Sequence, residues 1–155
     1  MLIGVPPILG PDLLATLRAM GHGDELAIVD GNYPALDHAR RLIRADGHGL
    51  TSLLDAILTV MPLDHAVASP ILRTGWGNDP ALAAPVHFEI DALVARRVPA
   101  FRIEPVAGAA FYARVRTCHA VIATSEPSLY ANVILRKGVI APPEPPVTRL
   151  KHPDE

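Results

Sequence analysis

Apolar residues near the start of the chain change from helical to strand-like spacing. From Leu13 to Met20 they recur on one helical face, Pro11 suits a first helical position, and Gly21 can adopt the left-handed conformation that ends a helix. This pattern predicts a helix over residues 11–20. The apolar run 26–29 has the length of a strand and precedes the turn-forming sequence Asp-Gly-Asn, so it predicts a buried strand.

The alternation continues toward the C-terminus. Ser52 and Asp55 make a capping box, which predicts a helix through Val60. Pro70 moves the strand predicted over 66–73 toward a sheet edge or a bulge, because proline cannot donate to a neighbouring strand. The other predicted elements are strands at 40–47, 100–104, 119–124 and 132–138 and helices at 85–97 and 109–115. This order predicts an α/β fold, a single domain with a central β-sheet flanked by helices.

Length and proline content suggest one domain followed by a tail. A chain of 155 residues can bury about 68–70% of the surface that it exposes when unfolded, so it needs no metal or disulfide to fold. Four prolines between residues 142 and 146 cannot join a sheet or a helix. We therefore expect a domain over residues 1–141 and an extended Pro-rich tail over 142–155.

Charge and hydropathy argue against several classes of partner. Fourteen Lys and Arg against sixteen Asp and Glu leave a net charge of −2, which favours neither nucleic acid nor an anionic membrane. The chain shows neither a secretory signal nor an apolar run near the ~18 residues of a membrane span. The single cysteine, Cys118, excludes an internal disulfide and favours the cytoplasm. Half of the residues are hydrophobic, and a homo-oligomer can bury the surplus.

The stretch GHGDELAIVDGNYPA, residues 21–35, holds the candidate chemistry. His22 lies between two glycines before the predicted strand, and Asp30 ends that strand, where ligands bind in open α/β sheets. Each has an ordinary structural explanation, since a histidine past a helix end favours the helix dipole and an Asp-Gly pair makes a turn. The flanking glycines favour function, because they expose the imidazole and let a ligand approach the backbone.

Other chemistries fit the sequence less well. The sequence GHGDEL lacks the third glycine of a phosphate-binding loop and precedes a strand, so nucleotide binding is not supported. The seven histidines form no HExxH motif and no Cys/His pairs at zinc spacing, so we expect no metal. Cys118 and His119 are neighbours at the start of a predicted strand and would point to opposite faces, so Cys118 is interpreted as a packing residue.

Four stretches together resemble the sugar mutarotase family of D-ribose pyranase and L-fucose mutarotase (RbsD/FucU). They are GHGDELAIVDGNYPA, IRADG, FYARV and LYANVILRKGV, and the last is more similar to the fucose branch. The likeness runs from about residue 8 to residue 139 and is poor between 67 and 100. It implies a cofactor-free enzyme that interconverts anomers or ring forms of a monosaccharide such as L-fucose. It also implies a ring-shaped homo-oligomer, often a decamer.

The resemblance assigns roles to four residues. His22 would be the catalytic proton donor, Asp30 a sugar ligand that also supports the imidazolium, and Tyr130 and Asn132 further sugar ligands. An imidazole, whose ordinary pKa is near 6.5, can take a proton from the anomeric hydroxyl and return one to the ring oxygen. Residues 130 and 132 would point to the same face of a strand, so both can reach one ligand.

One position departs from the family pattern. Members carry an Arg or His ahead of the pair Phe111-Tyr112 as a sugar ligand, whereas this chain has Pro105 or Gly108 there. Arg102 is the nearest substitute for sugar binding, although it can equally be a solvated strand residue.

Alternative functions therefore remain. The altered position favours an isomerase of another aldose or polyol, and a non-catalytic sugar-binding or regulatory protein of sugar uptake or catabolism is a further possibility. The presence of both His22 and Asp30 favours an enzyme. Trp76 can stack on the apolar face of a sugar or pack under its own loop.

Overall fold

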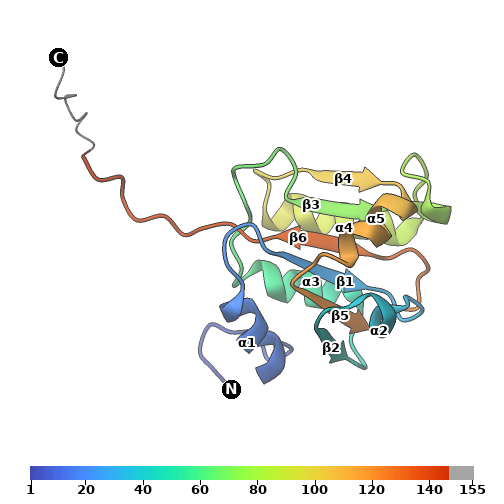
Figure 1. Cartoon of the computed structure of the whole chain (residues 1–155), viewed down its shortest axis with the longest axis horizontal. Coiled ribbons are helices and arrows are strands. Elements are labelled where there is room, and N and C mark those ends of the chain that lie inside the picture. Colours follow the sequence, from blue (N-terminus) through green and yellow to red (C-terminus); the bar gives the residue numbers. More distant parts are fainter. Residues whose placement is uncertain (147–155) are drawn as a thin grey trace, which may run out of the picture.

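A six-stranded mixed β-sheet forms the centre of the computed structural model, which describes residues 1–146. The strand order across the sheet is β2-β5-β1-β6-β3-β4 (Figure 1). The strands are β1 (Glu25–Val29), β2 (Leu42–Ala45), β3 (Ile71–Thr74), β4 (Ile103–Val106), β5 (Ala120–Thr124) and β6 (Val133–Arg136).

Strand direction determines which loops meet. β6 runs antiparallel to its neighbours β1 and β3, whereas the pairs β1–β5, β2–β5 and β3–β4 are parallel. The carboxyl ends of five strands and the amino end of β6 therefore share one edge of the sheet, which we call the carboxyl edge. The opposite edge is called the amino edge.

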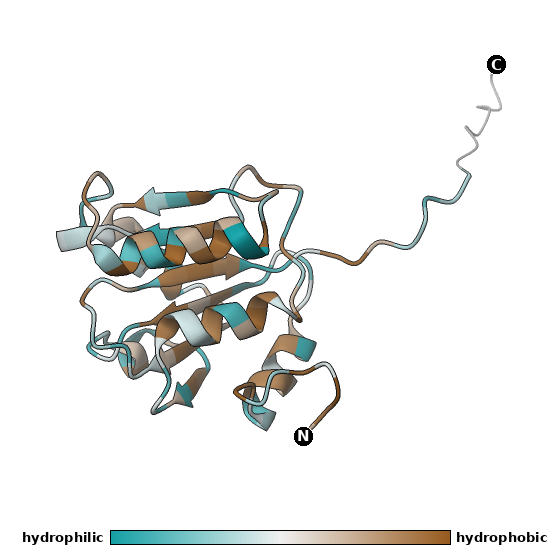
Figure 2. Cartoon of the chain, turned by 180° about the vertical axis from the view of Figure 1, so that it is seen from behind, coloured by the Kyte–Doolittle hydropathy of each residue, from teal (hydrophilic) through white to brown (hydrophobic). Residues whose placement is uncertain are grey.

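Helices cover both faces of the sheet. They are α1 (Pro11–Ala19), α2 (Ala35–His38), α3 (Leu50–Leu58), α4 (Pro85–Arg97) and α5 (Gly108–Val115), with a 3₁₀ helix η1 (Trp76–Asn78) after β3. α3 and α4 lie across one face, where their apolar sides join the main core (Figure 2), and α2 and α5 cover the other face. Within the described residues, no helix is long and apolar enough to cross a membrane.

The predicted α/β fold with a helix-flanked sheet is confirmed, but several element boundaries differ from the prediction, and two of the differences are informative. α3 begins at Leu50 rather than at a capping box of Ser52 and Asp55, because the Leu50 N–H donates to the carboxylate of Glu126 at 3.2 Å. β3 starts after Pro70 and lies inside the sheet, between β6 and β4. The proline precedes the strand and so leaves its pairing intact.

The C-terminal residues that the structure describes leave the domain in an extended path. Residues 142–146 have no regular secondary structure, are exposed and point away from the sheet (Figure 1). The remainder of the predicted tail, 147–155, lies outside the described residues.

Ending the chain after Ala141 should change neither the thermal unfolding temperature nor the oligomeric state. The prolines beyond this point contribute no ladder or helix hydrogen bonds. Differential scanning calorimetry and light scattering on the shortened and full chains measure both quantities. If the shortened chain dissociates, the segment is a docking element.

Candidate active site

Asp30 and Asn132 form a reciprocal pair at the carboxyl edge. Asp30 directly follows β1 and Asn132 directly precedes β6, and these strands are neighbours. The Asp30 N–H donates to Asn132 Oδ1 at 3.0 Å, and Asn132 Nδ2 donates to Asp30 Oδ2 at 3.1 Å. Both residues are buried. Two of the predicted sugar ligands are thus in direct contact, although 102 positions separate them in the chain.

The environment of Asp30 affects its charge in two opposing ways. Burial raises the pKa of its carboxyl group, and hydrogen bonds from the Asn32 N–H, at 2.9 Å, and from Asn132 act in the opposite direction. A carboxylate has about four acceptor positions. Asp30 can therefore keep these partners and accept further hydrogen bonds from the hydroxyl groups of a ligand.

Tyr130 lies in a turn at the same edge and not in β6, which begins at Val133. Its φ of 60° is in the left-handed region. The expectation that residues 130 and 132 share a strand face is therefore wrong. Tyr130 nevertheless stays at the site, and its ring lies edge-on to that of Trp76, with 5.4 Å between the centroids.

Two side chains form hydrogen bonds with the Tyr130 carbonyl. Thr74 Oγ1 donates to it at 2.6 Å, and Nε2 of the fully buried His87 lies 2.9 Å from it. His87 Nδ1 accepts the N–H of Ala84 at 2.8 Å, so the hydrogen of the neutral imidazole is on Nε2 and donates to the carbonyl. These contacts from β3 and α4 hold the turn in its strained conformation. Neither residue was predicted from the sequence, because Thr74 is 56 positions and His87 43 positions from Tyr130 in the chain.

The carboxyl edge is hollowed beside Asp30. Toward β2, a hollow of about 320 Å³ is lined by Asp30, Tyr33, Arg44 and Thr124, among others. Toward β3, Trp76 is 43% exposed beside Tyr130. A monosaccharide can approach the carboxylate through the hollow on the β2 side, and the exposed Trp76 ring offers an apolar surface on the β3 side.

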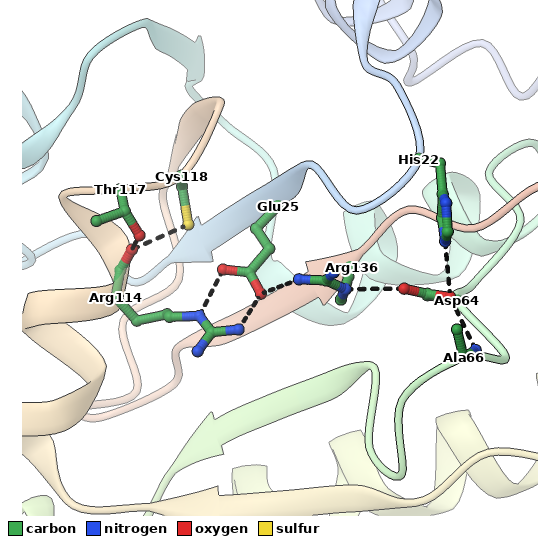
Figure 3. Close-up of polar contacts among 8 residues, drawn as sticks. All are labelled: His22, Glu25, Asp64, Ala66, Arg114, Thr117, Cys118 and Arg136. Atoms are coloured by element: carbon green, nitrogen blue, oxygen red, sulfur yellow. Dashed lines mark hydrogen bonds and ion pairs between the residues drawn. The ribbon is translucent and has the colours of Figure 1, made fainter.

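His22 lies at the amino edge, where it forms a dyad with Asp64 (Figure 3). His22 Nε2 is 3.0 Å from Asp64 Oδ1, and its side chain is 51% exposed, whereas that of Asp64 is 3% exposed. Arg136 Nε donates to the other carboxylate oxygen at 2.8 Å, and the Ala66 N–H donates to Oδ1 at 2.9 Å. Arg136 and these other donors hold the pKa of Asp64 well below its usual range.

The dyad determines the proton arrangement of the imidazole. Because Asp64 is ionised, it accepts a hydrogen bond, and His22 Nε2 must carry the hydrogen. Nδ1 is then the nitrogen that can accept or return a proton, and the Asp64 carboxylate stabilises the imidazolium. The sequence contains no short-range signal for this partner, since 42 positions separate the two residues.

Further charges continue the network along the amino edge. Arg136 Nη1 lies 3.8 Å from Glu25 Oε1, and Arg114 binds both Glu25 oxygens at 2.5 and 2.6 Å (Figure 3). A hollow of about 740 Å³ adjoins them, with Arg40 and His119 in its lining. Arg136 therefore connects the His22–Asp64 dyad to a polar hollow.

The predicted site residues fall into separate groups within one chain. Asp30, Tyr130 and Asn132 meet at the carboxyl edge, whereas His22 precedes β1 at the amino edge. β1 has five residues, and a strand rises about 3.3 Å per residue, so these edges are about 16 Å apart.

The residues considered near Phe111-Tyr112 also separate. Arg102 precedes β4 at the amino edge and lines a hollow with Arg73 and Asp91. Pro105 lies within β4, and Gly108 lies at the carboxyl edge as the first residue of α5.

Cys118 packs in the core between the sheet and α5. Its side chain is fully buried, and burial raises the pKa of the thiol to about 12. The thiol therefore stays protonated at neutral pH, which agrees with its interpretation as a packing residue.

Asp64→Asn should lower the free energy of unfolding at pH 7, by an amount that shrinks below about pH 4. The folded state lowers the Asp64 pKa below the unfolded value of about 3.9. Its stabilising contribution is therefore present above that value and is lost as pH falls toward the folded pKa. Urea unfolding between pH 7 and pH 2.5 measures the difference. Asp46→Asn is the matched control, because the exposed Arg44–Asp46 pair contributes little to the free energy of unfolding. A difference for Asp64→Asn that does not change with pH would contradict the prediction.

The comparison with protein families decides the classification. The model of the RbsD / FucU transport protein family matches residues 3–140. The chain belongs to the RbsD / FucU family. The resemblance of the four sequence stretches is thereby confirmed.

Individual relatives place the chain within the RbsD / FucU family. The fucose mutarotase of Bos taurus is 40% identical over 148 residues, which cover 92% of this chain and 96% of the bovine protein. The crystal structure of the fucose mutarotase from Streptococcus pneumoniae, in complex with L-fucose, is 39% identical with a TM-score of 0.82 and covers 90% of this chain and 100% of that one.

The ribose branch is less similar. Bacillus subtilis RbsD, complexed with D-ribose, is 21% identical with a TM-score of 0.72 and covers 91% of this chain and 100% of that one, which shows the shared fold alone. The greater similarity to the fucose branch, predicted from LYANVILRKGV, is confirmed.

Proposed function

We propose that this chain is a mutarotase that interconverts the anomers of a monosaccharide, with L-fucose as the first candidate substrate. The observation that carries the proposal is its similarity, over nearly the whole chain, to a fucose mutarotase with L-fucose bound. The reciprocal Asp30–Asn132 pair and the His22–Asp64 dyad supply the sugar-binding and acid–base groups that this reaction needs. No redox change occurs, so the proposed reaction needs no cofactor.

The chemistry consists of ring opening followed by closure on the other face. His22 Nδ1 takes the proton of the anomeric hydroxyl and returns it to the ring oxygen as the bond between the anomeric carbon and that oxygen breaks. Rotation about the bond next to the aldehyde and reversal of these proton transfers give the other anomer. Asp64 stabilises the imidazolium, and Asp30 and Asn132 hold sugar hydroxyl groups.

We further propose that two copies of the chain build each active site. His22 and Asp30 are at opposite edges of the sheet, about 16 Å apart, and one monosaccharide does not span that distance. In a closed homo-oligomer, the amino edge of one copy can face the carboxyl edge of the next.

The surface and composition support assembly. Large apolar side chains are exposed and available for an interface, namely Leu36, Leu82, Phe88 and Leu129. The decameric state remains an expectation from the family resemblance. The single cysteine is consistent with a location in the cytoplasm. Light scattering that shows only the 16.5 kDa monomer would contradict this assembly.

A non-catalytic sugar-binding protein is the second candidate. It is favoured by Gly108, which offers no side chain where the family resemblance leads one to expect an Arg or His. The same feature also favours a different aldose as the substrate.

Saturation transfer between anomer signals, measured by NMR on a panel of aldoses, tests these functions together. The mutarotase proposal predicts exchange above the uncatalysed rate for L-fucose or for a related aldose. Binding without exchange would establish the second candidate. If no sugar binds or exchanges, both candidates are wrong.

A further inference from the structure

Asn78 carries an unpaired polar atom in a buried position. Among the side-chain atoms of the described residues, its Oδ1 is the one that is buried and has no hydrogen-bond partner. An unpaired buried amide oxygen costs free energy, so such an atom in a native protein calls for a physical explanation.

The backbone of the same residue is strained. Asn78 ends η1 with φ at 65°, a left-handed conformation that residues other than glycine rarely adopt. Its N–H donates to the Gly75 carbonyl at 3.1 Å, which closes a tight turn after β3. Strain and a missing hydrogen bond thus coincide in one residue.

Gly108 makes room for the Asn78 side chain. A Cβ at position 108 would overlap the Cβ, Cγ and Oδ1 atoms of Asn78. The asparagine amide therefore fills the space that any other residue at 108 would occupy. Its Nδ2 makes no hydrogen bond within the described residues and is not buried, so it keeps free hydrogens at the surface.

The location of this amide connects it to the sugar-binding residues. β1, β6, β3 and β4 are consecutive in the sheet, so Asp30, Asn132 and Gly108 lie at neighbouring strand ends. From β6 to β4 the span is two strand spacings, about 10 Å. A hexose that forms a hydrogen bond of about 2.8 Å at either end can bridge it. Trp76, two residues before Asn78, already contacts Tyr130.

We propose that Asn78 contacts a sugar hydroxyl group and, together with Gly108, helps to set which monosaccharide the chain accepts. This inference rests on the proposed function. Oδ1 is buried against Gly108, so the exposed Nδ2 is the atom that can reach a ligand, and it recognises a neutral sugar by donating to one hydroxyl group. The left-handed backbone and the buried, unpaired Oδ1 are then the cost of holding Nδ2 toward the ligand.

Asn78→Gly tests the proposal, because it removes the amide and fits the left-handed backbone. The dissociation constant for the sugar that the wild type exchanges should rise about 3- to 10-fold, the loss of one neutral hydrogen bond. The thermal unfolding temperature should not fall, since strain and an unpaired atom are removed. Asn78→Asp serves as the second variant if the glycine variant fails to fold, because aspartate tolerates the left-handed conformation and lacks the Nδ2 donor.

Controls separate the possible outcomes. Asp79→Asn is the matched variant, since Asp79 is the exposed next residue and asparagine keeps the acceptor for the Ala81 N–H. A monodeoxy derivative of the sugar that lacks the contacted hydroxyl group should bind equally well to the wild type and to Asn78→Gly.

Two results would overturn the inference in distinguishable ways. If the wild type exchanges a sugar and Asn78→Gly keeps the wild-type dissociation constant, Asn78 is a structural residue only. If the wild type neither binds nor exchanges any sugar, the proposed function is wrong, and this inference is wrong with it.

Discussion

His22→Asn is expected to lower the rate of anomer exchange by about 100-fold or more, while sugar binding weakens much less. Asparagine can still hydrogen-bond to Asp64, so the loop should keep its conformation. It has no group that takes up and releases a proton near neutral pH. Saturation transfer measures exchange, and a sugar titration of the same folded variant measures binding.

The matched control for this substitution is His65→Asn. His65 is adjacent to Asp64 in the chain, is exposed, and its ring lies 4.6 Å from that of Phe101. This control should exchange sugar at the wild-type rate. If His22→Asn also keeps that rate, His22 is an ordinary residue after a helix, and the proton transfer must be assigned to Asp30 or Tyr130.

A mixture of the His22→Asn and Asp30→Asn variants should be more active than either variant alone if the site joins two copies. His22→Asn lacks the acid–base group, and Asp30→Asn weakens both binding and exchange because it removes the carboxylate that contacts the sugar. In mixed oligomers, about a quarter of the sites combine an intact His22 from one copy with an intact Asp30 from its neighbour. Exchange should therefore return to about a quarter of the wild-type rate.

Co-expression with two different affinity tags yields the mixed oligomers, and native mass spectrometry verifies their composition. Each variant purified alone is the control for residual activity. Mixed oligomers that stay as inactive as the separate variants would show that one chain holds the complete site. The recovery in this experiment depends on geometry alone, so it is independent of which sugar is used.

Short-range physical chemistry determined much of the fold. The helical spacing from Leu13 to Met20, the proline at the start of that helix and the apolar run of β1 act between residues close in the chain, so the α/β order could be predicted. Boundaries that depend on groups far away in the chain could not be predicted. α3 begins at Leu50 because Glu126, 76 positions away, accepts the Leu50 N–H.

The candidate site divides in the same way. The sequence by itself identified His22 and Asp30, because glycines and a strand end mark them locally, and the motif LYANVILRKGV pointed to Tyr130 and Asn132 through resemblance.

Only the tertiary structure decided what each of these groups contacts. The antiparallel β6 brings Asn132 to Asp30, and the loop before β3 brings Asp64 to His22. An extended β1 keeps the two groups at opposite edges of the sheet. Hydrogen bonds and charges act over a few ångströms in space, whatever the separation along the chain, so the sequence could name the chemical groups and only the folded sheet could pair them.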